Sequence, residues 1–355
     1  MKFKYQDKKI TGILTIVPKN VRTFDEEMSQ YDSSLTRMKR LKMVMGFKEH
    51  RIVKDGVCVS DLAIYGMEYL FQHGWLTKDE VDVLLLVTQS PDYFMPPTSN
   101  IIQGKLGLGH DVLCLDINQG CAGYIVGLMQ AFSLLDQVNV HKVVLINADV
   151  LSRKGSKQDR KSYPLAGDAA SITIVENDAK DGTNVSGVIH MDGTRADALI
   201  IPAGGFRQPC SQETRRMEKD DDGNLRCAEN LVMKGNDVFN FMQTEVPPLI
   251  DEVLSFAGQM KEEIDYFLMH QPNKFMVDKL AEAIGVSYEK MPDNIVTYFG
   301  NSSGVTIPTN ICFNLKDVMR QNICNVCLAG FGVGLTWGAM VMRLGQLDFC
   351  EMIEY

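Results

Sequence analysis

The chain has 355 residues, 45% of them hydrophobic and 23% charged, with a formal net charge of −9. The length suits two average domains or one large duplicated unit, and the acidic balance argues against partners that need a basic surface, namely nucleic acid and anionic membranes. No run reaches the roughly 20 apolar residues of a membrane span and the start does not resemble a signal peptide, so we expect a cytoplasmic protein.

Short apolar runs alternate with segments of helical length through the first part of the chain. We predict strands at 82–90, 112–118, 142–149 and 169–177, and helices at 98–108 and 121–137. Apolar strands separated by helices are typical of a sheet covered on both faces. The sequence therefore predicts a layered α/β fold.

The later part of the chain repeats this plan. A strand at 264–272 runs into a polar loop, as the strand at 82–90 does. Segment 294–311 has the form of a strand, a joint of small residues and a helix, and 325–344 supplies two strands around a glycine-rich turn. We therefore predict an internal duplication whose halves meet in a polar segment. The predicted halves are residues 1–178 and 179–355.

A charged stretch, residues 207–230, interrupts the second half. We interpret it as a solvated loop, with a lid or an interface element as the alternative. The nine cysteines are an odd number, which excludes a complete set of internal disulfides and suits a reducing compartment. Cys324 and Cys327 form a C-x-x-C, but a second ligand pair is not visible nearby, so we interpret them as strand packing and predict no metal site.

Cys121 stands in the small-residue segment GCAG, directly before a predicted helix. Unpaired N–H groups and the positive end of the helix dipole lie there, and both favour the nucleophilic thiolate. The sulfur would lie beyond the carboxyl end of a strand, where ligands bind in α/β sheets. Small neighbours would also leave room for a molecule to approach. On this segment alone, an inert residue in a tight turn remains the alternative.

His270 and Asn301 occupy related positions in the second half. His270 ends an apolar strand in FLMHQPN, and Asn301, in FGNSSG, occupies the joint that matches the Cys121 joint. The duplication would bring all three side chains together at one end of the sheets. A thiolate that acts on an acyl group needs such acid–base partners and an oxyanion site.

Four motifs, in the order CAG, HQPN, GNSSGVTIP and GFGVGLTWGA, resemble the motif series of the thiolase superfamily. Further matches are GFKEHRI (46–52), LAGDAASI (165–172) and MKGNDVF (233–239), so the resemblance covers nearly the whole chain. The most similar branch is the β-ketoacyl-ACP synthase III group. The resemblance implies a thiolase-like duplicated α/β/α/β/α layered fold, a homodimer and a condensing enzyme of fatty-acid or related acyl or polyketide biosynthesis.

The resemblance also implies residue roles. Cys121 would accept an acyl group from acyl-CoA, and a malonyl thioester would then lose carbon dioxide and attack it in a Claisen condensation. His270 and Asn301 would bind the thioester carbonyl of the extender, and the backbone N–H groups of Cys121 and Gly332 would form the oxyanion hole. Coenzyme A thioesters are substrates here, and no cofactor is implied. The implied substrate-binding residues are Gly235, Phe239 and Asn273 along a pantetheine tunnel, with Arg160 near the coenzyme A nucleotide.

Three places depart from the family pattern. Arg40 and Val44 stand where a tryptophan and an arginine often clasp coenzyme A, and Met95 replaces the aromatic residue that often limits the partner subunit's acyl pocket. For Met95, simple core filling is the alternative interpretation. Basic residues that usually meet an acidic acyl carrier protein are also missing, although Lys274 and Lys279 could restore part of that patch. The positions without the usual basic residue are Asn240, Phe275, Glu282 and Ala283.

Other functions remain open at this point. The serious rival is a thiolase-fold acyltransferase that forms an ester or amide without decarboxylation, although an intact Asn301 favours condensation. Papain-like proteases also use cysteine, histidine and asparagine, but their signature around the nucleophile is absent, and a non-catalytic scaffold would not need all three residues. The sequence leaves open the starter acyl group and whether the extender is carried by coenzyme A or by an acyl carrier protein.

Overall fold

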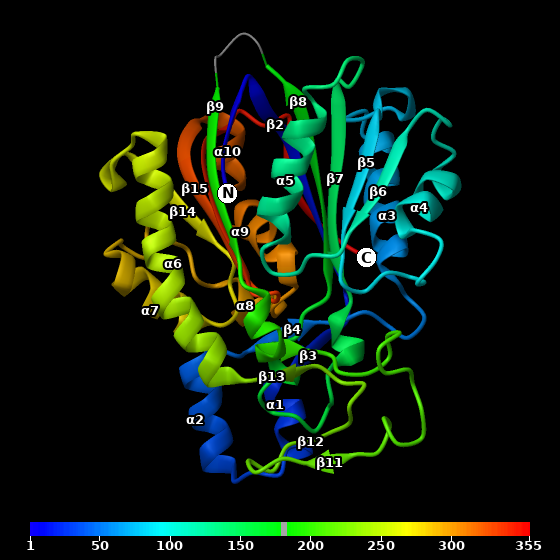
Figure 1. Ribbon diagram of the computed structural model, residues 1–355, viewed down its shortest axis with the longest axis vertical. Coiled ribbons are helices and arrows are strands. Elements are labelled where there is room, and N and C mark those ends of the chain that lie inside the picture. Colours follow the sequence, from blue (N-terminus) through cyan, green and yellow to red (C-terminus); the bar gives the residue numbers. More distant parts are fainter. Residues whose placement is uncertain (179–182) are drawn as a thin grey trace.

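The computed structural model describes residues 1–178 and 183–355, which form two large sheets packed face to face with helices between and outside them (Figure 1). The strands of the larger sheet are β2 (Lys8–Val17), β5 (Val83–Val87), β6 (Leu113–Ile117), β7 (Lys142–Asp149), β8 (Ala169–Asn177) and β17 (Phe349–Glu354). Those of the smaller sheet are β1 (Lys2–Gln6), β9 (Asn184–Met191), β14 (Tyr266–Met269), β15 (Ile323–Gly332) and β16 (Thr336–Gly345). Their orders are β17-β2-β8-β7-β5-β6 and β1-β9-β16-β15-β14.

The helices complete five layers. The central helices are α5 (Gly123–Leu134) and α9 (Thr306–Asn314), which lie between the sheets. Those on the outer faces are α3 (Val59–Gln72) and α4 (Thr98–Leu106) over the larger sheet, and α6 (Gly235–Ala257) and α7 (Lys274–Ile284) over the smaller one. This arrangement confirms the predicted α/β/α/β/α layers. No helix among the described residues is both long and apolar enough to cross a membrane.

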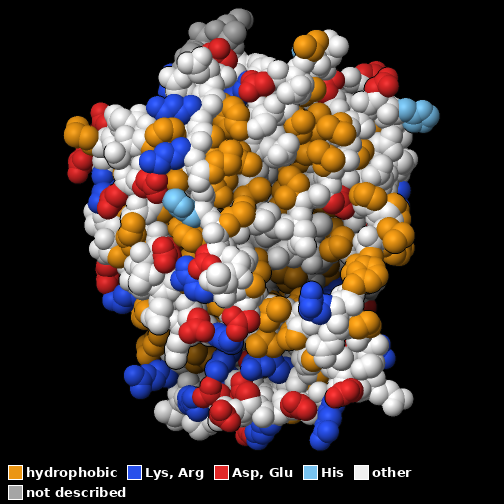
Figure 2. All heavy atoms as spheres, viewed as in Figure 1, with side chains coloured by type: hydrophobic (Ala, Val, Ile, Leu, Met, Phe, Trp, Pro, Cys, Tyr) orange, Lys and Arg blue, Asp and Glu red, His pale blue; other side chains and the backbone are white. Residues whose placement is uncertain are grey.

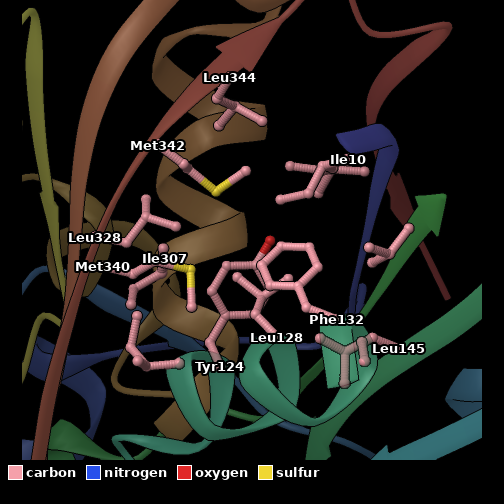
Figure 3. Close-up of a cluster of buried hydrophobic side chains, with 14 of the residues drawn as sticks. Ile10, Tyr124, Leu128, Phe132, Leu145, Ile307, Leu328, Met340, Met342 and Leu344 are labelled. Atoms are coloured by element: carbon pink, nitrogen blue, oxygen red, sulfur yellow. The ribbon is translucent and has the colours of Figure 1, made fainter. Parts of the chain in front are cut away.

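The central layer holds one continuous hydrophobic cluster. Tyr124 and Phe132 from α5 pack with Ile307 from α9, against Leu145 of the larger sheet and Met340 of the smaller sheet (Figure 3). All five side chains are fully buried. Burial of apolar side chains at this density is the main stabilising contribution to the fold. The cluster therefore fixes the position of one sheet relative to the other, and with it the site between their ends.

The predicted strands agree with the structure, with one exception. Residues 294–299, expected as a strand, form the short helix α8 (Ile295–Phe299). Its buried side chains recur at helical spacing, and the Ile295 N–H donates to the Gln271 side chain at the start of the helix. Gly300 has φ of +75°, and a Cβ there would lie 2.7 Å from the Ala166 carbonyl oxygen. Tertiary packing thus overrides the β-branched composition of this segment.

The sheets exchange their end strands. β1, from the start of the chain, pairs with β9, and β17, from its last residues, pairs with β2. In Figure 1 the N label lies beside β9, in the smaller sheet. Each predicted half therefore contributes one strand to the other half's sheet. The predicted boundary itself adjoins residues 179–182, outside the described residues, and stays a prediction.

The charged stretch 207–230 is mostly exposed, which agrees with the interpretation as a solvated loop, but it is also anchored at several points. It carries the hairpin of β11 (Glu218–Lys219) and β12 (Leu225–Arg226), between β10 (Leu199–Ile200) and β13 (Val232–Met233). Lys219 pairs with Asp32 at 2.5 Å, and Arg226 pairs with the buried Asp159 at 3.2 Å. The ion pairs explain the high charge density of this stretch.

The C-x-x-C residues are packing residues, as predicted. Cys324 belongs to the central cluster, whereas Cys327 packs on the other face of β15 under α6 and α7. Because the two sulfurs face opposite sides of one sheet, they cannot hold one metal ion together.

The remaining small elements gather at the lower end of Figure 1. They are β3 (Val21–Thr23), α1 (Phe24–Glu27), α2 (Leu35–Met45) and β4 (Glu49–Arg51), and α10 (Lys316–Gln321) follows α9 elsewhere. Charged side chains of both signs are concentrated at this end of the molecule (Figure 2).

Candidate active site

Cys121 lies at the base of a cavity of about 420 Å³, two residues before the first residue of α5. The cavity is mostly apolar, and Asn301, Ser303 and Gln89 supply part of its polar lining. Cys121 and Asn301, from different halves of the chain, thus reach the same cavity, whereas His270, the third residue expected to converge there, is not among the residues that line it.

The space beside the glycines around Cys121 is filled by other side chains of the protein. A Cβ at Gly120 would lie 2.1 Å from the Gln89 side-chain oxygen, and one at Gly332 would lie 2.6 Å from the Cβ of Cys121. The expectation that the small neighbours of Cys121 leave room for an approaching molecule is therefore wrong at Gly120, where the Gln89 side chain fills the space. The backbone N–H groups that act on the sulfur are those of Val333, the residue after the predicted oxyanion donor Gly332, and of Cys121 itself. The oxyanion role of Gly332 stays a prediction.

The Cys121 thiol is not acidified in the resting protein, contrary to expectation. Burial, and then the negative charge of Asp149, raise its pKa to about 11, although the Val333 N–H and the Ser303 hydroxyl lower it in part. Desolvation of the thiolate outweighs the donors at the helix end. Asp149 is itself buried, which raises its pKa to about 6, while hydrogen bonds from the Gln89 N–H and the Ser90 hydroxyl partly offset that effect.

His270 follows directly after β14, as predicted, and is almost completely buried. Burial lowers its pKa to about 3, so the ring is neutral at physiological pH. Its Nδ1 lies 2.8 Å from the Thr306 hydroxyl oxygen, which also lies 3.1 Å from the Ser303 carbonyl oxygen. The Phe331 ring packs edge-to-face against the imidazole. These contacts fix the ring in one orientation.

Asn301 is held by its backbone and by one side-chain atom. Its N–H donates to the Leu165 carbonyl at 2.6 Å, and its carbonyl accepts from the Gly167 N–H at 3.0 Å. Its Oδ1 accepts from the Ser303 N–H at 2.9 Å. Within the part of the chain that the structure describes, no group accepts from its Nδ2. The amide is thereby oriented, and its NH₂ group remains available to a bound molecule.

Sequence reasoning missed a buried pair behind Asn301. His50 was given no role, but it is buried and its Nδ1 donates to the Ala166 carbonyl at 2.5 Å. Its Nε2 lies 3.2 Å from the buried Glu27 carboxylate. Ala166 forms an isolated β-bridge with Asn301, so the pair supports the segment that holds Asn301. Glu27, His50 and Ala166 are far apart in the sequence, and the motifs GFKEHRI and LAGDAASI contain His50 and Ala166 but give no sign of their contact.

A second cavity, of about 710 Å³, adjoins the first. It contains the four positions assigned to substrate binding on family grounds together with Arg40 and Val44. These four are Arg160, Gly235, Phe239 and Asn273. Leu165, Met233 and Asn301 line both cavities, so the two spaces meet beside Asn301.

Two predicted binding residues have unexpected surroundings. Arg160 is 5% exposed and donates to the Asn224 side chain of the 207–230 stretch, so that stretch helps to position it. Met95 is 77% exposed and does not line either cavity of its own chain, which excludes core filling. A role for Met95 in the pocket of a partner subunit stays a prediction.

Comparison with known proteins agrees with this site. The family described as "3-Oxoacyl-[acyl-carrier-protein (ACP)] synthase III" matches residues 115–193, and its C-terminal counterpart matches residues 254–344. These matches include the nucleophile segment, His270 and Asn301.

The relatives match over the full length. A Campylobacter jejuni protein assigned as a 3-oxoacyl-[acyl-carrier-protein] synthase 3 is 32% identical, over 100% of this chain and 99% of its own. The beta-ketoacyl-[acyl-carrier-protein] synthase III of Streptococcus mutans is 30% identical, over 95% and 99%. The crystal structure of a 3-oxoacyl-(acyl-carrier protein) synthase from Burkholderia xenovorans LB400 superposes with a TM-score of 0.92, at 31% identity over 100% and 99%. The chain therefore belongs to the 3-oxoacyl-[acyl-carrier-protein] synthase III family of the thiolase superfamily, whose members are condensing acyltransferases.

Proposed function

We propose that this chain transfers an acyl group from acyl-CoA to Cys121 and then condenses it with a malonyl thioester. The observation that carries the proposal is the meeting of the two cavities beside Asn301. A pantetheine arm in the larger cavity would bring its thioester to the junction, and the acyl group on Cys121 would occupy the smaller one. The apolar lining of the smaller cavity favours an apolar starter group.

In the first half-reaction, the Cys121 sulfur attacks the carbonyl carbon of acyl-CoA. The backbone N–H of Cys121 and the backbone at 332–333 would stabilise the tetrahedral oxyanion. The carbon–sulfur bond to coenzyme A then breaks, and coenzyme A leaves with the proton that Cys121 gives up. Because the resting thiol has a raised pKa, proton loss must accompany substrate binding.

In the second half-reaction, the malonyl thioester loses carbon dioxide, and the electron pair of the broken carbon–carbon bond forms an enolate. Asn301 Nδ2 would donate a hydrogen bond to the enolate oxygen. The neutral His270 would donate a second one from Nε2, in the tautomer whose Nδ1 accepts from the Thr306 hydroxyl. The enolate carbon attacks the acyl-cysteine carbonyl, and a β-ketoacyl thioester forms. Cys121 leaves as a thiolate and takes up one proton. Because His270 stays neutral, we assign it hydrogen-bond donation rather than proton transfer.

The experiment is intact-mass spectrometry of the protein with a panel of acyl-CoAs, followed by a malonyl thioester. We expect an acyl adduct on wild type, its discharge by the malonyl thioester with carbon dioxide release, and no adduct on Cys121→Ala. Cys327→Ala, which removes a buried packing cysteine, is the matched control and should acylate normally. An adduct that persists in Cys121→Ala would refute the assignment of Cys121. An adduct that is hydrolysed by water but not discharged by the malonyl thioester would refute condensation.

We also propose that the protein is a homodimer. Strand β6 forms an open edge of the larger sheet, and its side chains Leu113 and Leu115 are exposed. The exposed Phe94, whose ring packs at a tilt against that of Phe206, adds apolar surface beside Met95. Uncovered strand edges with apolar side chains pair readily with another chain.

Sedimentation at micromolar concentration should give a dimer for wild type and a monomer for Leu113→Lys combined with Leu115→Lys. A wild-type monomer would contradict the proposal. In the dimer, Met95→Phe should shift the acyl-chain preference. An unchanged preference would contradict the proposal that Met95 lines the acyl pocket of the partner subunit.

A further inference from the structure

The basic charge at the entrance of the larger cavity lies on α2. This helix, LTRMKRLKMVM, carries four basic side chains and no acidic one, in a chain of net charge −9. Lys42 pairs with Asp25 at 2.6 Å. No carboxylate among the described residues pairs with Arg37, Lys39 or Arg40. Three positive charges on α2 are therefore available to a partner.

Two faces of α2 have different surroundings. Arg37, Arg40 and Val44, at helical spacing, line the larger cavity. Leu35, Lys39 and Met43 are four residues apart and form a second face of α2, which we call the outer stripe. Leu35 and Met43 are exposed at 58% and 76%. The outer stripe thus combines a positive charge with apolar side chains that the described residues do not cover.

The helix on the other side of the entrance lacks available positive charge. Lys274, at the start of α7, pairs with Asp278 at 2.9 Å and also with Asp293. Lys279 pairs with Glu282 at 2.6 Å. The two lysines that could have restored a basic patch on α7 are therefore neutralised within the chain. Phe275 packs on Phe239 beside them and makes that side of the entrance apolar.

We propose that α2 is the docking site for an acidic acyl carrier protein that delivers the malonyl group. Arg37, Lys39 and Arg40 would meet its acidic side chains, and Leu35 and Met43 would contact apolar side chains between them. The carrier's phosphopantetheine arm would then enter between α2 and α7, whose ends are in contact, since a Cβ at Gly46 would lie 2.6 Å from Lys274. In Figure 1, α2 lies at the opposite side of the molecule from β6, so the proposed dimer would leave it accessible.

This inference rests on the proposed function, because it assigns a partner to the same site. The test compares condensation rates with malonyl-CoA and with a malonyl-loaded bacterial fatty-acid acyl carrier protein. The variants are Lys39→Glu and the double variant Lys39→Glu, Met43→Glu, both outside the cavity lining. Lys279→Glu on α7 is the matched charge-reversal control. Thermal unfolding of each variant checks that the fold is intact.

Lys39→Glu should raise the KM for the malonyl-carrier about fivefold, and the double variant should raise it about tenfold or more, since charges at a docking surface mainly steer encounter. The KM for malonyl-CoA should change less than about twofold, because free coenzyme A does not need the outer stripe of α2. Lys279→Glu should leave both values near wild type. Rising sodium chloride should reduce the carrier-dependent rate of wild type more than that of Lys39→Glu.

An equal loss with malonyl-CoA would overturn the inference and assign α2 to the coenzyme A phosphates. A selective loss in Lys279→Glu instead would return the docking site to α7. If wild type condenses malonyl-CoA but not the malonyl-carrier, the proposed function stands and the docking site fails. If wild type condenses neither, the proposed function itself fails.

Discussion

Cys121 and Asn301 line the same cavity from the two halves of the chain, and their surroundings differ. Around Cys121, burial and then the charge of Asp149 raise the pKa of the thiol and disfavour the thiolate. Around Asn301, two backbone hydrogen bonds and one to Oδ1 hold the amide before any substrate is present. The donor that we propose for the enolate is therefore pre-organised, which is the usual way in which donors stabilise charge that develops only in the transition state.

The sharpest test of this difference is Asn301→Ala, which removes the Nδ2 donor without adding a negative charge to the cavity that Cys121 lines. Loss of a donor to a developing oxyanion typically costs about 10²–10³ in rate, so decarboxylation should fall by that order. Acylation of Cys121 should stay within about threefold of wild type, because Nδ2 has no role in that step. Stopped-flow release of coenzyme A and carbon dioxide measures the two steps separately. Equal loss in both would contradict the division of roles.

A smaller effect is expected at Thr306. Thr306→Val keeps the shape of the side chain but removes the hydroxyl beside His270 Nδ1, so the proton is no longer directed to one nitrogen of the ring. One hydrogen bond is worth about 1 kcal/mol, so the decarboxylation rate should fall roughly five- to tenfold with acylation unchanged. Thr306→Ser restores the hydroxyl and should restore the rate. If Thr306→Ser is as slow as Thr306→Val, the hydroxyl does not act on His270.

The smallest predicted effect concerns Asp149 and stability. Folding raises its pKa from 3.8 to about 6, so the folded state favours the protonated carboxyl. This contribution is complete below pH 3.8 and is lost as the pH rises through 6. Between pH 5 and pH 7.5, wild type should lose about 1–1.5 kcal/mol of unfolding free energy relative to Asp149→Asn. Urea unfolding at several pH values measures this difference. A constant difference would show that the carboxyl is ionised throughout.

The positions of Cys121 and His270 were predictable because their sequence signals are local. Cys121 is marked by a short small-residue joint before a helix, and His270 by a polar residue directly after an apolar strand. The ends of strands and the starts of helices are set mainly by nearby residues, so the predicted positions of the two residues agree with the structure. The α8 segment was predicted wrongly because Gln271 and Ala166, distant in sequence, decide its conformation.

Properties that depend on surroundings could not be predicted. The helix end at Cys121 indicated an acidic thiol, but Asp149 and the walls of the cavity reverse that effect. Glu27 and His50, which are in contact, are separated by 23 positions in the sequence, and His50 and Ala166, which are hydrogen-bonded, by 116. Likewise, the sequence suggested a basic patch at Lys274 and Lys279. In the structure both lysines pair with carboxylates of the same chain.

The exchange of β1 and β17 also governs when this protein can acquire its native structure during synthesis. β2 receives its outer partner only from residues 349–354, more than 330 residues later in translation. β1 must wait for β9, since Lys2 pairs with Val188. Contacts of such sequence separation form slowly, and unpaired strand edges favour aggregation. A nascent chain stalled before β17 would leave β2 as an open edge, so we expect it to depend on chaperones until the last strand has left the ribosome.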